Sequence, residues 1–92
     1  MTREKIVGLL YEGYIDNEYN AKDCYHKANI NQRHENYYAE DVWADKGNNY
    51  SKLSCIYYYL YLRYDSMNAR NFNSDIAHKV LKILRNAENA LY

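Results

Sequence analysis

The chain has 92 residues, including 13 tyrosines, three glycines and no proline, and its formal net charge is zero. The length predicts a single domain, residues 1–92, and the scarcity of glycine and proline excludes a small β fold, which needs these residues at its turns. Leu, Ile, Val and Phe make up less than a fifth of the chain, but the zero net charge and the buriable area of the tyrosines predict a folded all-α domain rather than disorder.

The first predicted helix covers residues 3–12. Thr2 precedes it and can accept a hydrogen bond as its N-cap. Apolar residues between Ile6 and Leu10 recur at the spacing of one helix face. Gly13 is expected to end this helix, because glycine readily takes the left-handed conformation that follows many helix C-termini.

The second predicted element covers residues 17–46, with Asp16 or Asn17 as its N-cap. Residues 29–36 contain a single apolar side chain. This segment is therefore either the exposed middle of one long helix or a break between two helices. Gly47 and the two asparagines that follow it are expected to end the element.

The third predicted helix covers residues 50–68 and the last covers residues 74–91. Apolar and tyrosine side chains occupy nearly every side of the third helix, which is typical of a central helix covered by its neighbours. Residues 56–64 also have strong β propensity, but a strand needs a partner strand and the chain offers none. The last helix has a regular apolar stripe, with Asn73 or Ser74 as its N-cap.

Together these elements predict a small bundle of three to five helices. The chain has no apolar N-terminal run of signal-peptide length and no long uncharged stretch, which predicts a cytoplasmic protein without a membrane-spanning segment. In that compartment Cys24 and Cys55 are expected to be free thiols that face the core.

No set of residues predicts catalysis. The soft metal-ligand candidates lack the paired spacing of a metal site; they are Cys24, His26, His34, Cys55 and His78. Asp41 and Asp45 lie one turn apart without a base beside them, as on a solvated acidic helix face. The sequence therefore predicts a protein that is not an enzyme and that binds no metal or cofactor.

Aromatic and acidic side chains gather shortly before Gly47. Tyrosine beside tryptophan, rimmed by charge, is the composition of a protein-binding hot spot. We therefore expect an outward-facing partner-binding surface at Tyr37, Tyr38, Asp41, Trp43 and Asp45.

Five tyrosines fall between residues 56 and 64, too many for the core of so small a bundle. Some must meet solvent, a partner or another copy of the chain, because tyrosine offers a large and rigid contact area. An interface for a homodimer is expected at Tyr57, Tyr58, Tyr61 and Tyr64.

Charge is divided along the chain, with a net charge of −3 on residues 1–46 and of +3 on residues 47–92. The simplest interpretation is that acidic helices pack beside basic ones. The alternative is that basic residues of the second half, interleaved with Tyr and Asn, bind the phosphates of a nucleic acid or nucleotide. These residues are Arg70, Lys79, Lys82 and Arg85.

The preferred interpretation is a non-enzymatic protein–protein interaction module. Abundant Asn, Tyr, Lys and Ile are typical of an AT-rich coding sequence, as in a phage, a plasmid or a low-GC bacterium. In that setting the expected role is inhibition, in which the protein binds and occludes a host protein, for example a defence complex such as a CRISPR effector.

Overall fold

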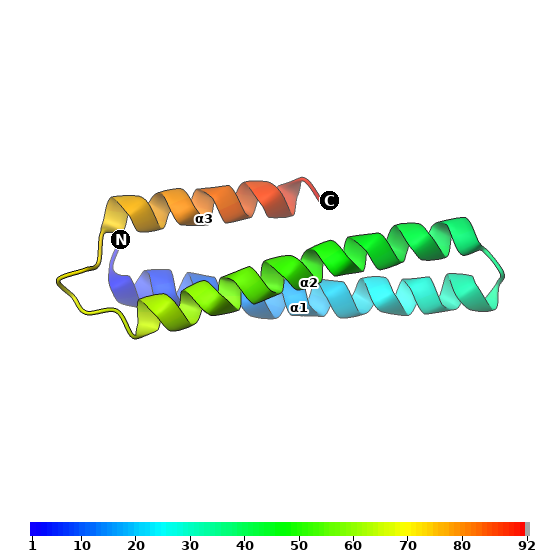
Figure 1. Ribbon diagram of the computed structural model, residues 1–92, viewed down its shortest axis with the longest axis horizontal. Helices are drawn as coiled ribbons and strands as arrows, with labels where there is room; N and C mark the ends of the chain where they lie inside the picture. The colour runs from blue at the N-terminus through cyan, green and yellow to red at the C-terminus, as the bar shows by residue number, and fades with distance from the viewer. Residues whose placement is uncertain (92) are drawn as a thin grey trace.

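Three helices make up the fold. The computed structural model describes residues 1–91, and its helices are α1 (Arg3–Arg33), α2 (Tyr37–Asp65) and α3 (Ser74–Asn89). α1 and α2 pack antiparallel along their lengths as a helical hairpin, and α3 lies beside the half of the hairpin that contains the N-terminus (Figure 1). The prediction of an all-α bundle of three to five helices is confirmed.

The molecule is elongated, with extents of 55 × 20 × 14 Å. The two hairpin helices have 31 and 29 residues and α3 has 16, so α3 is only about half as long as the helices that it covers. Leu91, just after α3, packs against Ala21, Cys24 and Tyr50. The rest of the hairpin, residues 25–46, is called the arm. Among the described residues, no third helix covers the arm (Figure 1).

The two glycines that were expected to end helices lie inside helices instead. A Cβ at Gly13 would overlap the ring of Tyr57, and a Cβ at Gly47 would lie 2.8 Å from the ring of Tyr25. Each glycine thus leaves room for a tyrosine ring from the opposite helix. The predicted boundaries near Gly13 and Gly47 are wrong because a glycine that admits a neighbouring ring has the same local sequence signal as a helix stop.

The chain reverses between α1 and α2 within residues 34–36, inside the segment where the sequence left open a break. Glu35 has a φ of 59°, and the backbone N–H groups of Glu35 and Asn36 donate to the carbonyls of Gln32 and Asn31. This hydrogen-bond pattern is a Schellman motif, which satisfies the last carbonyls of α1. The Asn36 Oδ1 then accepts from the N–H of Ala39 and caps α2.

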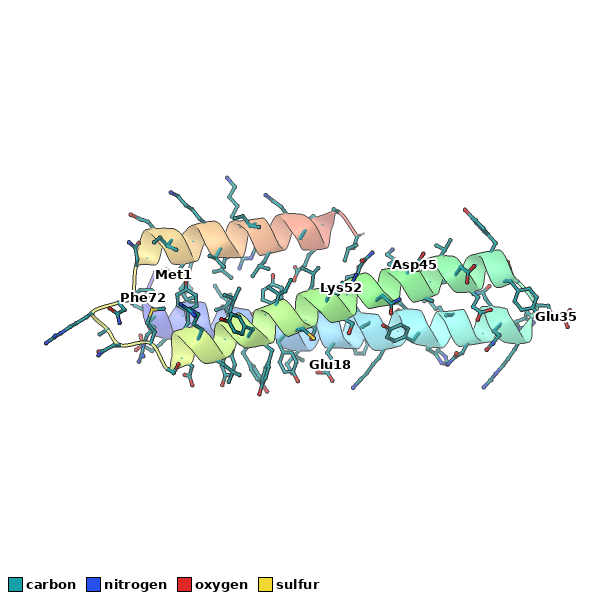
Figure 2. The ribbon with its side chains drawn as sticks, viewed as in Figure 1. Met1, Glu18, Glu35, Asp45, Lys52 and Phe72 are labelled. Atoms are coloured by element: carbon teal, nitrogen blue, oxygen red, sulfur yellow. The ribbon has the colours of Figure 1, made fainter. Side chains whose placement is uncertain are left out.

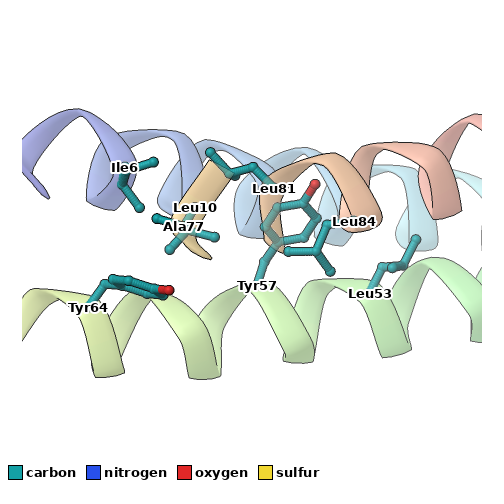
Figure 3. Close-up of a cluster of buried hydrophobic side chains, with 8 residues drawn as sticks. All are labelled: Ile6, Leu10, Leu53, Tyr57, Tyr64, Ala77, Leu81 and Leu84. Carbon is teal, nitrogen blue, oxygen red and sulfur yellow. The ribbon is translucent and has the colours of Figure 1, made fainter. Parts of the chain in front are cut away.

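The main core lies where all three helices meet (Figure 3). Its buried side chains are Ile6 and Leu10 from α1, Leu53, Tyr57 and Tyr64 from α2, and Ala77, Leu81 and Leu84 from α3. Residues 56–64 are helical, so the strand interpretation is wrong. Tyr57 and Tyr64 take the place that leucine or phenylalanine has in most cores, as the composition predicted.

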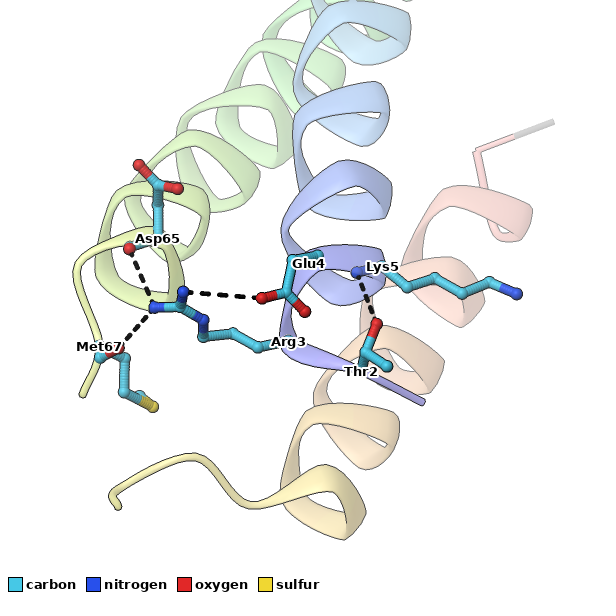
Figure 4. A network of polar contacts seen from close by, with 6 residues as sticks. All are labelled: Thr2, Arg3, Glu4, Lys5, Asp65 and Met67. Carbon is cyan, nitrogen blue, oxygen red and sulfur yellow. Dashed lines mark hydrogen bonds and ion pairs between the residues drawn. The ribbon is translucent and has the colours of Figure 1, made fainter. Parts of the chain in front are cut away.

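Polar contacts tie the N-terminus to the other helices. Arg3 Nη1 donates to the carbonyl of Met67 at 2.7 Å and to that of Asp65 at 3.4 Å, and so covers the C-terminal end of α2 (Figure 4). Thr2 caps α1 and Asn73 caps α3, as predicted. Over the described residues, no helix combines the length and the apolar composition needed to cross a membrane.

Candidate partner-binding face

Four tyrosine rings gather on the surface of the hairpin, two from each helix. Tyr11 and Tyr14 come from α1, and Tyr58 and Tyr61 come from α2. The ring centroids of Tyr14 and Tyr58 are 4.7 Å apart, and those of Tyr11 and Tyr61 are 5.2 Å apart. These distances are those of favourable aromatic pairs. We call this cluster the tyrosine face.

The tyrosine face lies on the side of the hairpin away from α3. Leu9 and Asp16 of α1 line a small pocket together with residues of α3, whereas Tyr11 and Glu18 each follow two residues later. Two residues rotate a side chain by about 200° around a helix. Figure 2 shows Glu18 on the edge of the hairpin that is remote from α3.

A groove of about 310 Å³ continues the tyrosine face toward the arm. Both helices line it, with Tyr14, Glu18, Ala21, Lys22 and Tyr25 on α1 and Ser51, Ser54 and Cys55 on α2. The groove is thus half apolar, with two tyrosines, and half polar, and it is open to solvent along the seam between the two helices.

Hydrogen bonds hold the walls of this groove. Ser54 Oγ donates to the carbonyl of Tyr14 at 3.0 Å, and the Tyr25 hydroxyl donates to Asn48 Oδ1 at 2.6 Å. Both bonds link α1 to α2. These bonds hold the groove in position, and a preformed surface lowers the entropic cost of binding in general.

Charge fixes the ring of Tyr14 in the same way. A hydrogen bond to the Glu18 carboxylate raises the pKa of Tyr14, while the ammonium of Lys22 and then the Tyr14 hydroxyl lower the pKa of Glu18. Lys22 Nζ lies 3.1 Å from Glu18 Oε1. The three side chains form a ladder at successive turns of α1 that orients the ring toward Tyr58.

The predicted partner-binding residues do not form one surface. Tyr37, Tyr38, Asp41 and Asp45 share the exposed outer side of α2, with Tyr38 83% exposed. Trp43 points the other way. Its ring is partly buried and packs against the small cluster of Ala21, Cys24 and Tyr50.

Two lysines hold the tryptophan ring in that position. The Nζ atoms of Lys27 and Lys46 lie 4.5 and 5.5 Å from the centroid of the Trp43 ring. At these distances a cation is attracted to the face of an indole. The expectation that Trp43 faces outward with the tyrosines and aspartates is wrong, because its position on α2 faces α1.

The predicted dimer residues are also divided. Tyr57 and Tyr64 are only 2% and 6% exposed and belong to the core of the same chain, so neither is accessible to a second copy. Tyr58 and Tyr61 belong to the tyrosine face. A sequence signal for the other half of that face exists, because Tyr11, Tyr14, Glu18 and Tyr25 repeat at the spacing of one helix face. The expected helix end at Gly13 concealed it.

Tyr57 links the hairpin to α3 through a buried polar contact. Burial first, and then a hydrogen bond to the Glu88 carboxylate, raise the pKa of Tyr57. Asn17 Nδ2 donates to the same carboxylate at 2.6 Å and to the carbonyl of Gly13 at 2.7 Å. These hydrogen bonds to Glu88 hold the C-terminal end of α3 against the hairpin.

The basic residues predicted for nucleic-acid contact are brought together in part. Lys79, Lys82 and Arg85 line a groove of about 490 Å³ along α3. Arg70 lies in the connection between α2 and α3 and is not part of that groove.

The two cysteines have different surroundings. Both are free thiols, but Cys24 is buried and Cys55 is exposed, so the expectation that Cys55 faces the core is wrong. Burial raises the pKa of the Cys24 thiol and makes it unreactive. Among the described residues no group of three or more His, Cys, Asp or Glu side chains is placed to hold a metal ion.

Comparisons were made with protein families, with curated proteins and with solved structures. None of the three gave a match.

Proposed function

We propose that the protein is a non-enzymatic protein-binding module and that its partner contacts the tyrosine face. The observation that carries this proposal is the gathering of Tyr11, Tyr14, Tyr58 and Tyr61 at the surface, where Tyr11 and Tyr58 remain 45% and 42% exposed. Tyrosine is enriched in the energetic centres of protein interfaces, because it buries a large area at a low cost in rotamer entropy.

The surface area of the chain supports a partner. The chain exposes 6461 Å², whereas a monomeric protein of its mass is expected to expose about 5,700 Å². The difference of roughly 800 Å² matches the area that one partner buries in an interface of standard size. The excess follows from the elongated shape of the molecule, and a bound protein would cover an area of comparable size.

The groove beside the rings gives the face a shape that a partner can recognise. Its aromatic wall suits an apolar anchor side chain, and its rim offers Glu18, Lys22 and Ser51 for hydrogen bonds. A central aromatic cluster with a polar rim is the usual organisation of a protein interface. If the protein comes from a phage or another mobile element, occlusion of a host protein is the simplest role for such a surface.

The test is affinity capture from a lysate of the cells that produce the protein, with three forms of the chain as bait. The first is the native chain, the second is Tyr11→Ser with Tyr58→Ser, and the third is Tyr37→Ser with Tyr38→Ser. The third form removes two exposed rings from a different surface and is the matched control. We expect one protein to be retained by the native and control chains and lost by the tyrosine-face variant by at least about tenfold, the effect of a hot-spot loss of about 1.4 kcal/mol.

Equal capture by all three forms would contradict the proposed face, and loss only in the control would move the site to the outer side of α2. Light scattering of the purified native chain tests the remaining case, in which the partner is a second copy. A dimer that the tyrosine-face variant dissociates would identify that partner.

A further inference from the structure

A second surface, on α3, has the opposite character to the tyrosine face. Its groove of about 490 Å³ is lined by Met1, His78, Lys79, Leu81, Lys82, Arg85, Asn86 and Asn89. None of these residues is acidic, although the whole chain is neutral. The two acidic residues of α3, Asp75 and Glu88, lie outside this lining.

None of the described carboxylates forms a salt bridge with a cation of this groove. The salt bridges found over residues 1–91 involve Arg3, Lys22 and Lys27 and none of the three cations of the α3 groove. Lys79, Lys82 and Arg85 are all exposed. Asp75, one turn before Lys79, is outside the lining. Arg85 also lines the pocket on the inner side of α3, where Glu12, Asp16 and Glu88 lie.

The polar side chains follow the axis of α3. From Lys79 to Asn89 the helix advances by about 15 Å, which is longer than one phosphate group. Asn86 and Asn89 continue the row beyond the cations as neutral hydrogen-bonding groups. A ligand that satisfies the whole row needs several anionic groups in a line, as the phosphates of a nucleic-acid strand provide.

We propose that this groove binds the phosphate backbone of a single-stranded nucleic acid. Lys79, Lys82 and Arg85 neutralise successive phosphates, and Asn86 and Asn89 donate to the next. His78 supplies the one aromatic ring of the lining, so binding rests mainly on the phosphates and carries little base preference. The groove and the tyrosine face lie on different sides of the hairpin, so one chain can hold a strand and a protein at the same time.

The test uses fluorescence anisotropy of a labelled single-stranded oligothymidylate with the full chain, titrated with salt. Lys79→Ala with Lys82→Ala removes two cations from the groove. Lys52→Ala with Arg63→Ala removes the same charge from α2, outside both surfaces, and is the matched control. Because all four residues are exposed, both variants are expected to keep the native circular dichroism spectrum.

The native chain should bind at low salt, with affinity falling as roughly the second power of the salt concentration, since each phosphate contact on a single strand contributes about 0.7 to the slope. The groove variant should lose at least tenfold in affinity and most of that slope, while the control should lose less than twofold. Equal losses in both variants, or no binding by the native chain at low salt, would overturn the proposal. Equal affinity for tripolyphosphate would overturn the assignment to a strand.

The two proposals fail independently. The groove variant should still capture the protein partner, and the tyrosine-face variant should still bind the oligonucleotide. Loss of both activities in one variant would contradict the assignment of two separate surfaces.

Discussion

At the scale of single residues, two glycines decide how closely the hairpin helices approach. The ring of Tyr57 occupies the space above Gly13, and the ring of Tyr25 occupies the space beside Gly47. The third glycine, Gly8, is exposed and would place a Cβ in open space. α1 therefore contains one glycine that packing requires, Gly13, and one that it does not require, Gly8.

Alanine substitutions at these two positions of α1 should have opposite effects. Gly8→Ala should stabilise the protein by about 0.5–1 kcal/mol, because alanine loses less backbone entropy in a helix. Gly13→Ala should destabilise it by about 1–3 kcal/mol, because the added methyl displaces the Tyr57 ring. Urea denaturation followed by circular dichroism measures both, and stabilisation by Gly13→Ala would show that the close contact is absent.

The hydroxyl of Tyr57 should make stability depend on alkaline pH. Its pKa is raised in the folded protein by burial and by Glu88, so the folded state keeps the proton while the unfolded state loses it above about pH 10. The stabilisation is complete below that pH and falls as the pH rises further, by up to about 1.4 kcal/mol per pH unit.

Tyr57→Phe is the control for this titration. The variant should be less stable at neutral pH, because Glu88 loses a hydrogen bond, but its stability should fall less steeply above pH 10. Equilibrium denaturation at a series of pH values gives both slopes. Identical slopes for the two proteins would mean that Tyr57 does not titrate in the expected direction.

At the scale of elements, the turn between α1 and α2 contains a strained residue. Glu35 adopts a φ of 59° at the position after the helix C-cap where glycine is normally favoured. The left-handed conformation costs a residue with a Cβ about 1–2 kcal/mol. Its neighbour His34 has an ordinary φ of −91°.

Glu35→Gly should therefore raise stability by about 0.5–1 kcal/mol, the relief of strain less the added freedom of glycine in the unfolded chain. For a domain of this size that corresponds to an increase in Tm of about 2–8 °C. His34→Gly serves as the control, because glycine at a residue with negative φ only adds unfolded-state entropy and should lower the Tm. A lower Tm for Glu35→Gly would contradict the turn geometry.

The sequence predicted helix type better than helix boundaries, and it predicted the caps in part, because the expected cap at Asp16 or Asn17 lies inside α1. Thr2 and Asn73 were recognisable as caps because a capping side chain acts within three residues. The continuity of α1 through Gly13 depends on Tyr57, which lies far away in the sequence, so no local pattern reveals it. The same error hid the tyrosine face, since Tyr11 and Tyr14 share a surface with Tyr25 only if α1 is unbroken.

At the scale of the whole molecule, a short third helix divides the hairpin into a covered half and a bare arm. The covered half has the core, with the tyrosine face and the basic groove on different sides of it. The arm carries Tyr37 and Tyr38 on its outer side and the tryptophan on its inner side. Such an elongated shape offers more surface than one core requires, which supports the proposal that a partner binds the tyrosine face.

The measurement that tests the protein-binding proposal most directly is the rate at which Cys55 reacts with a thiol reagent, with and without the captured partner. Cys55 is exposed and lines the groove of the tyrosine face, while Cys24 is buried and serves as the internal reference. In the free protein Cys55 should react quickly and Cys24 only on unfolding. The proposal predicts at least a tenfold slower reaction of Cys55 in the complex; an unchanged rate would show that the partner binds elsewhere.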